Sequence, residues 1–407
     1  MTAEQVFLLN CMKLAVQKKH LQTLPENISI DWTALIAEAY SQTVSLPLFD
    51  VVSQLQKELP EEIYQKLFEQ ARRFTACNMR VEHAQAQLVS VLEQMNCPYV
   101  ILKGETAAAD YPVPELRQLG DVDFLAPEEH MAAITEKMQA LGFRHSWEPG
   151  DYHQVLEKPG ACLEMHMEVA GMPKGETRQT AADFFADIYE SSRLLDRGFG
   201  PFRAPCQAHH GMILLLHMQH HVVAHGMGLR HIMDWACFVD KTHEEPFWQE
   251  RLLPVLQELG LFYFTAVMTK MASLYFGSCC PDWAQAAEEQ LCRDLMEDIL
   301  SGGNFGRKDE DRSRAQNMLP DWEQEGKRPG KLKLLYKTLR HSALSSNPQL
   351  EGRPVALFFA MIGRALRYLV LFFRGERPNL LKSAAFADQR RSIYEQLRMF
   401  EKSKENL

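Results

Sequence analysis

Two acidic residues that are separated by a single position, Asp121 and Asp123, lie in a short apolar segment of the chain and could bind a divalent cation. Residues 121–125 have the composition of a buried strand. Alternate residues of a strand share one face, so both carboxylates would point the same way while Val122 and Phe124 face the core. The spacing therefore predicts a pair of carboxylates at one surface of a sheet.

The same alternation places Glu164 and His166 on one face of a second segment, residues 163–167. If the two strands are neighbours, Asp121, Asp123 and Glu164 converge, and like charges so close together oppose each other's ionisation. Mg²⁺ or Mn²⁺ would remove this cost, because Mg²⁺ binds one or two carboxylates together with substrate phosphates. The residues thus predict a metal site of the kind that two-metal phosphoryl transfer requires.

A glycine turn precedes the acidic pair. Residues 98–103 read as a strand that ends at Gly104, and residues 106–111 read as a helix. The backbone N–H groups at such a turn could bind a phosphate. Glu105 would repel that phosphate unless its side chain faces away.

The elements that must position these residues form an α+β arrangement, in which a small mixed-sheet core at 95–200 is flanked by helical regions at 1–94 and 201–407. Helical periodicity runs to about residue 94, with 61–95 as one long helix. An amphipathic helix at 127–141 follows the acidic pair. Further strands are expected at 143–147, 153–157 and 161–169, and helices resume at Ala181 and continue to the end.

A histidine-rich helix follows the core, at residues 207–234. His217 and His221 are four residues apart, a spacing that can chelate zinc. A phosphohydrolase of the histidine–aspartate type would use such ligands, but it has an adjacent His-Asp pair, and no histidine directly precedes Asp234. We instead expect the helix to pack on the core. Some of its histidines would then line the cleft beside Arg230.

The run VILKGETAAADYPVPELRQLGDVDFL, with LEMHME further along the chain, resembles the bacterial uncharacterised "nucleotidyltransferase family" within the polymerase-β-like superfamily. The resemblance spans about residues 60–240. It is carried by a Leu-Lys-Gly turn, a Tyr-Pro pair, an arginine, an Asp-x-Asp and a Glu-x-His, which are here Leu102-Lys103-Gly104, Tyr111-Pro112, Arg117, Asp121-Val122-Asp123 and Glu164-Met165-His166.

The resemblance implies transfer of a nucleotidyl group from an NTP, with ATP favoured, to an acceptor that the sequence does not identify. It implies catalytic and metal-binding roles for Asp121, Asp123 and Glu164. It implies nucleotide binding by Lys103, Gly104, Thr106, Arg117 and His166. It also implies a cleft lined by five further residues, which are His153, His217, His221, Arg230 and Asp234. The superfamily's phosphate turn is usually Gly-Ser or Gly-Gly, whereas Glu105 follows Gly104 here. The first alternative is therefore an inactive nucleotide-binding or regulatory module of the same fold, and the second is the histidine-helix phosphohydrolase.

Net charge, cysteine content and long apolar runs limit which classes of protein the sequence fits. The net charge of -9 argues against a general nucleic-acid-binding surface, which would be basic. Nine scattered cysteines without a C-x-x-C indicate reduced thiols and a cytoplasmic location, and the first residues do not read as a signal peptide. Residues 355–373 are as long as a membrane span, but Arg364 and Arg367 interrupt them. We expect a mostly buried helix there, with peripheral membrane contact as the alternative.

Overall fold

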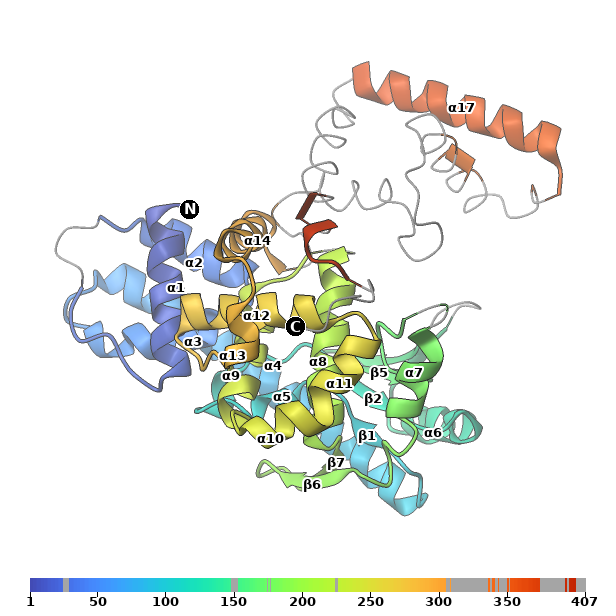
Figure 1. Cartoon of the computed structure of the whole chain (residues 1–407), viewed down its shortest axis with the longest axis horizontal. Coiled ribbons are helices and arrows are strands. Elements are labelled where there is room, and N and C mark those ends of the chain that lie inside the picture. Colours follow the sequence, from blue (N-terminus) through green and yellow to red (C-terminus); the bar gives the residue numbers. More distant parts are fainter. Residues whose placement is uncertain are drawn as a thin grey trace.

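The computed structural model describes the chain almost continuously as far as residue 304 (Figure 1). The described residues are 1–24, 29–147, 153–173, 175, 177–223, 226–304, 308, 336, 339–340, 343, 350, 352–373, 392–393 and 395–399.

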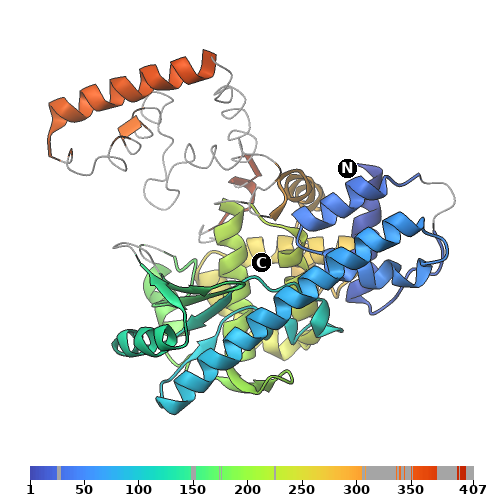
Figure 2. The same cartoon turned by 180° about the vertical axis from the view of Figure 1, so that it is seen from behind.

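The N-terminal region is helical, as expected. It consists of α1 (Ala3–Val16), α2 (Trp32–Ser41), α3 (Ser45–Val52), the 3₁₀ turn η1 (Ser53–Leu55) and α4 (Glu61–Gln94). Thr2 and Gln5 form a capping box at the start of α1, and Asp31 caps α2 by accepting hydrogen bonds from two backbone N–H groups. The long helix predicted from residue 61 is confirmed: α4 has 34 residues and extends from the N-terminal helices to the sheet (Figure 2).

A five-stranded mixed sheet forms the centre of the α/β unit, so the predicted α+β class is confirmed. Its strands are β1 (Val100–Ile101), β2 (Val122–Leu125), β3 (Arg144–Ser146), β4 (His153–Lys158) and β5 (Ala161–His166), arranged in the order β1-β2-β5-β4-β3. Among the strand pairs described in this sheet, β2–β5 is parallel and the others are antiparallel. Between the strands lie α5 (Glu105–Ala108), η2 (Pro114–Leu116) and α6 (Glu128–Ala140).

The sheet separates an apolar side from a polar side. On the apolar side, Leu163 and Met165 of β5 pack in one cluster with Leu88 of α4 and with Ile134 and Met138 of α6. The alternate residues of β5 face the other way. This amphipathic pattern explains why the polar residues of β2 and β5 end on a common face.

A second, two-stranded sheet corrects the expectation that helices run without interruption from Ala181. After α7 (Thr177–Phe184), the strands β6 (Arg193–Asp196) and β7 (Pro201–Ala204) form an antiparallel hairpin. Its turn contains Gly198 and Gly200 at φ values of 92° and 105°, which only glycine adopts readily. Phe202 and Ala204 are buried against the larger sheet's core, so the hairpin is stabilised by packing that lies outside its own sequence.

Helices make up the remainder of the described chain. They are α8 (Gln207–Val223), α9 (Leu229–Lys241), α10 (Glu245–Phe247), the π-helical turn η3 (Trp248–Leu252), α11 (Leu253–Glu258), α12 (Phe262–Phe276), α13 (Asp282–Gln285), α14 (Glu289–Gly302) and α17 (Pro354–Phe373). Helix α1 packs against both α9 and α12, and one apolar core includes residues from α1 to α14. The two flanking helical regions therefore pack together in space.

Helix α17 lies apart from the rest of the molecule in both views (Figures 1 and 2). The prediction of a mostly buried helix is wrong, because most of the side chains described there are exposed and only Leu357 and Met361 among them are buried. Val355 is 70% exposed, Phe358 58% and Phe359 66%. Among the described residues, no helix combines the length and apolar character needed to cross a membrane.

Candidate functional site

The site is built on the two parallel strands β2 and β5. Asp123 and Glu164 are direct partners in the register, and the adjacent strand β4 places His153 opposite His166. The sequence predicted that Glu164 and Asp123 would come together only if their strands were neighbours, and the pairing places those strands side by side. Asp121 lies immediately before β2.

Asp123 is the best-connected carboxylate of the group. It is 3% exposed, and its Oδ2 is 2.9 Å from the Nζ of Lys103 while its Oδ1 is 2.8 Å from the Nε2 of His166. Burial by itself favours the neutral acid, but Lys103 and His166 outweigh this effect and hold the pKa of Asp123 well below its ordinary value. Asp123 is therefore ionised although it is buried.

Asp121 experiences the opposite balance. Burial and the negative charge of Asp123 raise its pKa, Lys103 acts against them, and Glu164 raises the pKa further. Arg230 offsets this rise only in part. Like charges are thus crowded at this face of the sheet, as the sequence predicted.

Glu164 and the two histidines complete the group. The Oε2 of Glu164 lies 3.6 Å from the Nε2 of His166 and 3.8 Å from the Nε2 of His153. Potential ligand atoms of Asp123, Glu164 and His166 all lie within 4.8 Å of one another. His166, which the sequence assigned to nucleotide binding, is thus part of this tight set of potential metal ligands. We call Asp121, Asp123, Glu164 and His166 the carboxylate cluster.

The turn at Gly104 has a conformation that favours glycine, with φ 64° and ψ -112°. The next residue, Glu105, is 1% exposed, and it accepts a hydrogen bond of 2.9 Å from Arg197. The negative charge that seemed incompatible with a phosphate at this turn is therefore paired with Arg197, a residue from the β6–β7 turn. No sequence pattern linked these two residues, because 92 positions separate them.

Thr106 and Arg117, two of the residues predicted to bind nucleotide, form hydrogen bonds within the protein. The hydroxyl of Thr106 is fully buried and donates a hydrogen bond of 2.6 Å to the carbonyl oxygen of Ile101. Arg117 is 6% exposed and donates two hydrogen bonds of 2.8 Å to the carboxylate of Asp234, which also accepts one from Tyr111. Arg117 and Asp234 thus connect η2 to α9.

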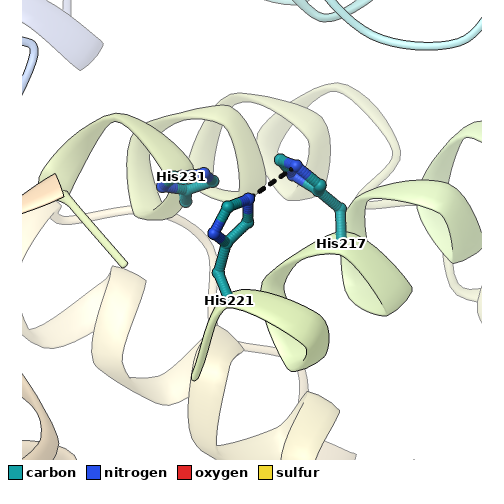
Figure 3. A group of neighbouring side chains, drawn as sticks. All are labelled: His217, His221 and His231. Carbon is teal, nitrogen blue, oxygen red and sulfur yellow. Dashed lines mark hydrogen bonds between the residues drawn. The ribbon is translucent and has the colours of Figure 1, made fainter. Parts of the chain in front are cut away.

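The histidine-rich segment forms a separate group. His217 and His221 of α8 are joined there by His231 of α9, which the sequence did not single out (Figure 3). We call these three residues the histidine cluster. Arg230, next to His231, donates a hydrogen bond of 3.0 Å to the carbonyl oxygen of Gln118. The spacing of four residues indicated the first two histidines, but His231 belongs to another helix and only the α8–α9 packing brings it in.

Residues 29–277 match the family model described as uncharacterised nucleotidyltransferase. The chain belongs to this family. The matched region extends from before α2 to the end of α12, so it contains the sheet, the carboxylate cluster and the histidine cluster. No curated protein and no solved structure gives a significant match.

Membership of the nucleotidyltransferase family agrees with the recognition made from the Leu-Lys-Gly, Asp-x-Asp and Glu-x-His motifs. The structure adds that Asp123 and Glu164, from the second and third of these motifs, lie among candidate metal ligands. By contrast, Asp234 pairs with Arg117 and Tyr111 and is not among the potential metal ligands found with the histidine cluster in the described residues.

Proposed function

We propose that this chain transfers a nucleotidyl group from an NTP, with ATP the favoured donor, to a hydroxyl-bearing acceptor. Asp121, Asp123 and Glu164 would hold Mg²⁺ or Mn²⁺. The observation that carries the proposal is the parallel pairing of β2 with β5, which makes Asp123 and Glu164 register partners beside Asp121.

The residues present fit a hard divalent cation. Three carboxylates supply oxygen donors, the ligand type that Mg²⁺ prefers. The raised pKa of Asp121 reflects burial and crowding by Asp123 and Glu164, a cost that a cation would remove. When bound, the metal supplies positive charge that links the carboxylates to the triphosphate and stabilises the charge that develops on it.

The chain's own groups would divide the remaining tasks. The ammonium group of Lys103 is held against Asp123 and would neutralise charge on the departing pyrophosphate. Glu164 is less buried than Asp123 and would accept the proton of the acceptor hydroxyl. Amide groups at the Gly104 turn would bind phosphate oxygens, since the charge of Glu105 is paired with Arg197. Because Arg117 is held by Asp234, the proposal gives the neutralising role to Lys103.

A second candidate is a module that binds nucleotide without transferring it. Both oxygens of Asp123 already have partners, in Lys103 and His166. Each oxygen of an ionised carboxylate has two lone pairs, so Asp123 could still bind a metal, but fewer positions are free than in an unpaired carboxylate. Glu105 also replaces the small residue that is usual after the glycine.

A binding experiment tests the site. The melting temperature of the full-length chain is measured with each NTP, with and without Mg²⁺ or Mn²⁺. We expect a stabilising shift only when metal is present, because the carboxylates repel a bare triphosphate. Asp123→Asn should abolish the shift, whereas Glu157→Gln, in an exposed ion pair on β4 of the same sheet, should retain it. An equal shift without metal would place the nucleotide elsewhere.

A transfer experiment separates the two candidates. The chain is incubated with each α-labelled NTP, Mg²⁺ and a cell lysate, and labelled products and pyrophosphate are measured. Labelled product that is lost in Asp123→Asn supports the transferase. Metal-dependent binding without label transfer or pyrophosphate release supports the binding module.

A further inference from the structure

Three imidazole rings from two helices meet in the histidine cluster (Figure 3). The Nε2 atoms of His217 and His221 are 2.9 Å apart, and potential ligand nitrogens of all three residues lie within 4.8 Å of one another. His221 and His231 are 5% and 3% exposed, while His217 is half-buried. The cluster is therefore a compact set of nitrogen atoms with one member that solvent can reach.

One nitrogen of the cluster, the Nε2 of His231, has no hydrogen-bond partner among the described residues. The Nδ1 of His231 accepts a hydrogen bond of 3.3 Å from the backbone N–H of Gly228. The Nε2 of a neutral His231 therefore carries the ring's proton, and this buried atom has no hydrogen-bond partner among the described residues. Buried polar atoms without partners are rare in folded proteins and call for an explanation, such as an ion.

The three rings are neutral at physiological pH. Burial, assisted by the positive charge of Lys103, holds the pKa values of His217 and His221 well below the ordinary value. Burial and then the charge of Arg230 do the same for His231. A neutral imidazole has one nitrogen with a free lone pair, which is the form that binds metals.

We propose that His217, His221 and His231 bind a transition-metal ion of the zinc class through three imidazole nitrogens, with the fourth position left to water. This site would be distinct from the carboxylate cluster, because imidazole suits Zn²⁺ whereas Mg²⁺ prefers oxygen ligands. Three protein ligands and an open position are the arrangement of catalytic zinc sites.

The present geometry needs only small changes to hold the ion. Tetrahedral Zn–N bonds of about 2.0–2.1 Å place ligand nitrogens roughly 3.3 Å apart. His217 and His221 would separate slightly, and His231 would approach by side-chain rotation. Ligation through Nε2 requires the proton of His231 to move to Nδ1, so the Gly228 hydrogen bond is exchanged for a metal–nitrogen bond.

Nearby charge does not prevent binding. Lys103 and Arg230 would repel a dication, but the ammonium group of Lys103 is paired with Asp123 at 2.9 Å. Arg230 interacts favourably with the charges of Asp234 and Asp121. The repulsion is thus largely compensated by acidic residues on the neighbouring elements.

The test uses the tag-free, full-length chain after removal of metal with a chelator. Zn²⁺ is titrated by calorimetry and Co²⁺ by visible absorption, which is intense only for tetrahedral coordination. We expect one tight site that is retained in Glu164→Gln, a variant that removes a carboxylate from the carboxylate cluster and leaves the Lys103–Asp123 ion pair in place. His221→Ala and His217→Asn should each weaken binding at least about 100-fold, since even indirect partners of a metal ligand typically account for 10–100-fold. His220→Ala, an exposed histidine of the same helix, should bind as the wild type does.

Several outcomes would overturn the proposal. These are a wild-type chain that binds no Zn²⁺ at micromolar concentration, loss of all binding in Glu164→Gln, or an unchanged Co²⁺ spectrum in His217→Asn. Circular dichroism checks the fold of each variant. Because His217 is only half-buried, His217→Asn remains informative if His221→Ala does not fold, and Glu164→Gln reports on the site without altering any histidine or the partner of Lys103. This metal site does not depend on the proposed transferase, whose failure would leave Zn²⁺ binding unchanged.

Discussion

The carboxylate cluster and the histidine cluster differ in the charge state of their buried ionisable groups. On β2 and β5, Asp123 keeps its charge because Lys103 and His166 compensate it. Between α8 and α9, the histidines stay neutral, because burial and neighbouring cations disfavour their charged forms. Buried ligands can thus be either charged carboxylates with compensating partners or neutral imidazoles. The two kinds of ligand suit different ions, because Mg²⁺ prefers carboxylate oxygen whereas imidazole nitrogen suits Zn²⁺.

Lys103 links the two regions, because its charge acts on both. It lowers the pKa of Asp123 and also those of His217 and His221. The positions of the clusters have different origins, however. The register of two strands aligns Asp123 with Glu164, whereas the packing of two helices brings His231 to His217.

The largest expected effect concerns catalysis. Asp121→Asn or Asp123→Asn should reduce label transfer by at least about two to three orders of magnitude, as expected when a group that holds transition-state charge is lost. His217→Ala and His221→Ala should reduce it less, because their rings lie outside the carboxylate cluster. Rates are compared on folded variants at saturating Mg²⁺. The opposite ranking would move the active site to the histidine helix.

The next effect is on stability and involves the ion pair that joins η2 to α9. Arg117→Ala should lower the free energy of unfolding by about 3–5 kcal/mol, because it leaves the buried carboxylate of Asp234 without its cation. Arg144→Ala, which removes an exposed partner of Glu157, should change it by no more than about 1 kcal/mol. Urea unfolding measures both. Equal changes in the two variants would show that Arg117 is not a structural residue.

A smaller effect is expected where the chain approaches the histidine helix closely. Gly171 has φ 82°, and a Cβ atom there would lie 2.5 Å from the carbonyl oxygen of Leu216, next to His217. Gly171→Ala should therefore destabilise the chain by about 2–3 kcal/mol. Gly175→Ala, with φ 71° but open space around it, should cost only about 1 kcal/mol. Similar melting temperatures for the two variants would contradict this close packing against α8.

The smallest expected effect is on the pH dependence of stability and involves Glu82, a carboxylate whose charge is incompletely compensated. Burial, followed by the charge of Glu105, raises the pKa of Glu82 to about 7, with Arg197 acting against them. The folded state then holds a proton that the unfolded state has lost, so stability falls as the pH rises from about 4.5 to 7. Glu82→Gln should raise the free energy of unfolding at pH 8 by no more than about 1 kcal/mol, since Glu82 is partly solvated. The gain should disappear as the pH falls toward 4.5, and a gain that is constant with pH would exclude this cause.

Local periodicity was sufficient to predict much of the fold. The spacing of apolar residues indicated α4 within one residue of its observed end, and the alternation around Asp123 and Glu164 indicated which side chains share a face. The Lys103-Gly104 turn was also recognisable, because its positive φ favours glycine. These features depend on neighbours in sequence, which is why they can be predicted from the sequence.

The remaining features depend on contacts between distant residues. Arg117 and Asp234 are 117 positions apart, and no local spacing indicated that an arginine of the nucleotide-binding motif would form an ion pair with α9. The β6–β7 hairpin is stabilised by the larger sheet's core, and His231 joins the histidine cluster only because α9 packs on α8. The sequence by itself thus determined which residues are chemically capable and which face of an element they occupy. Only the tertiary structure decided their partners, because a side chain's partner depends on the packing of whole elements and not on local spacing.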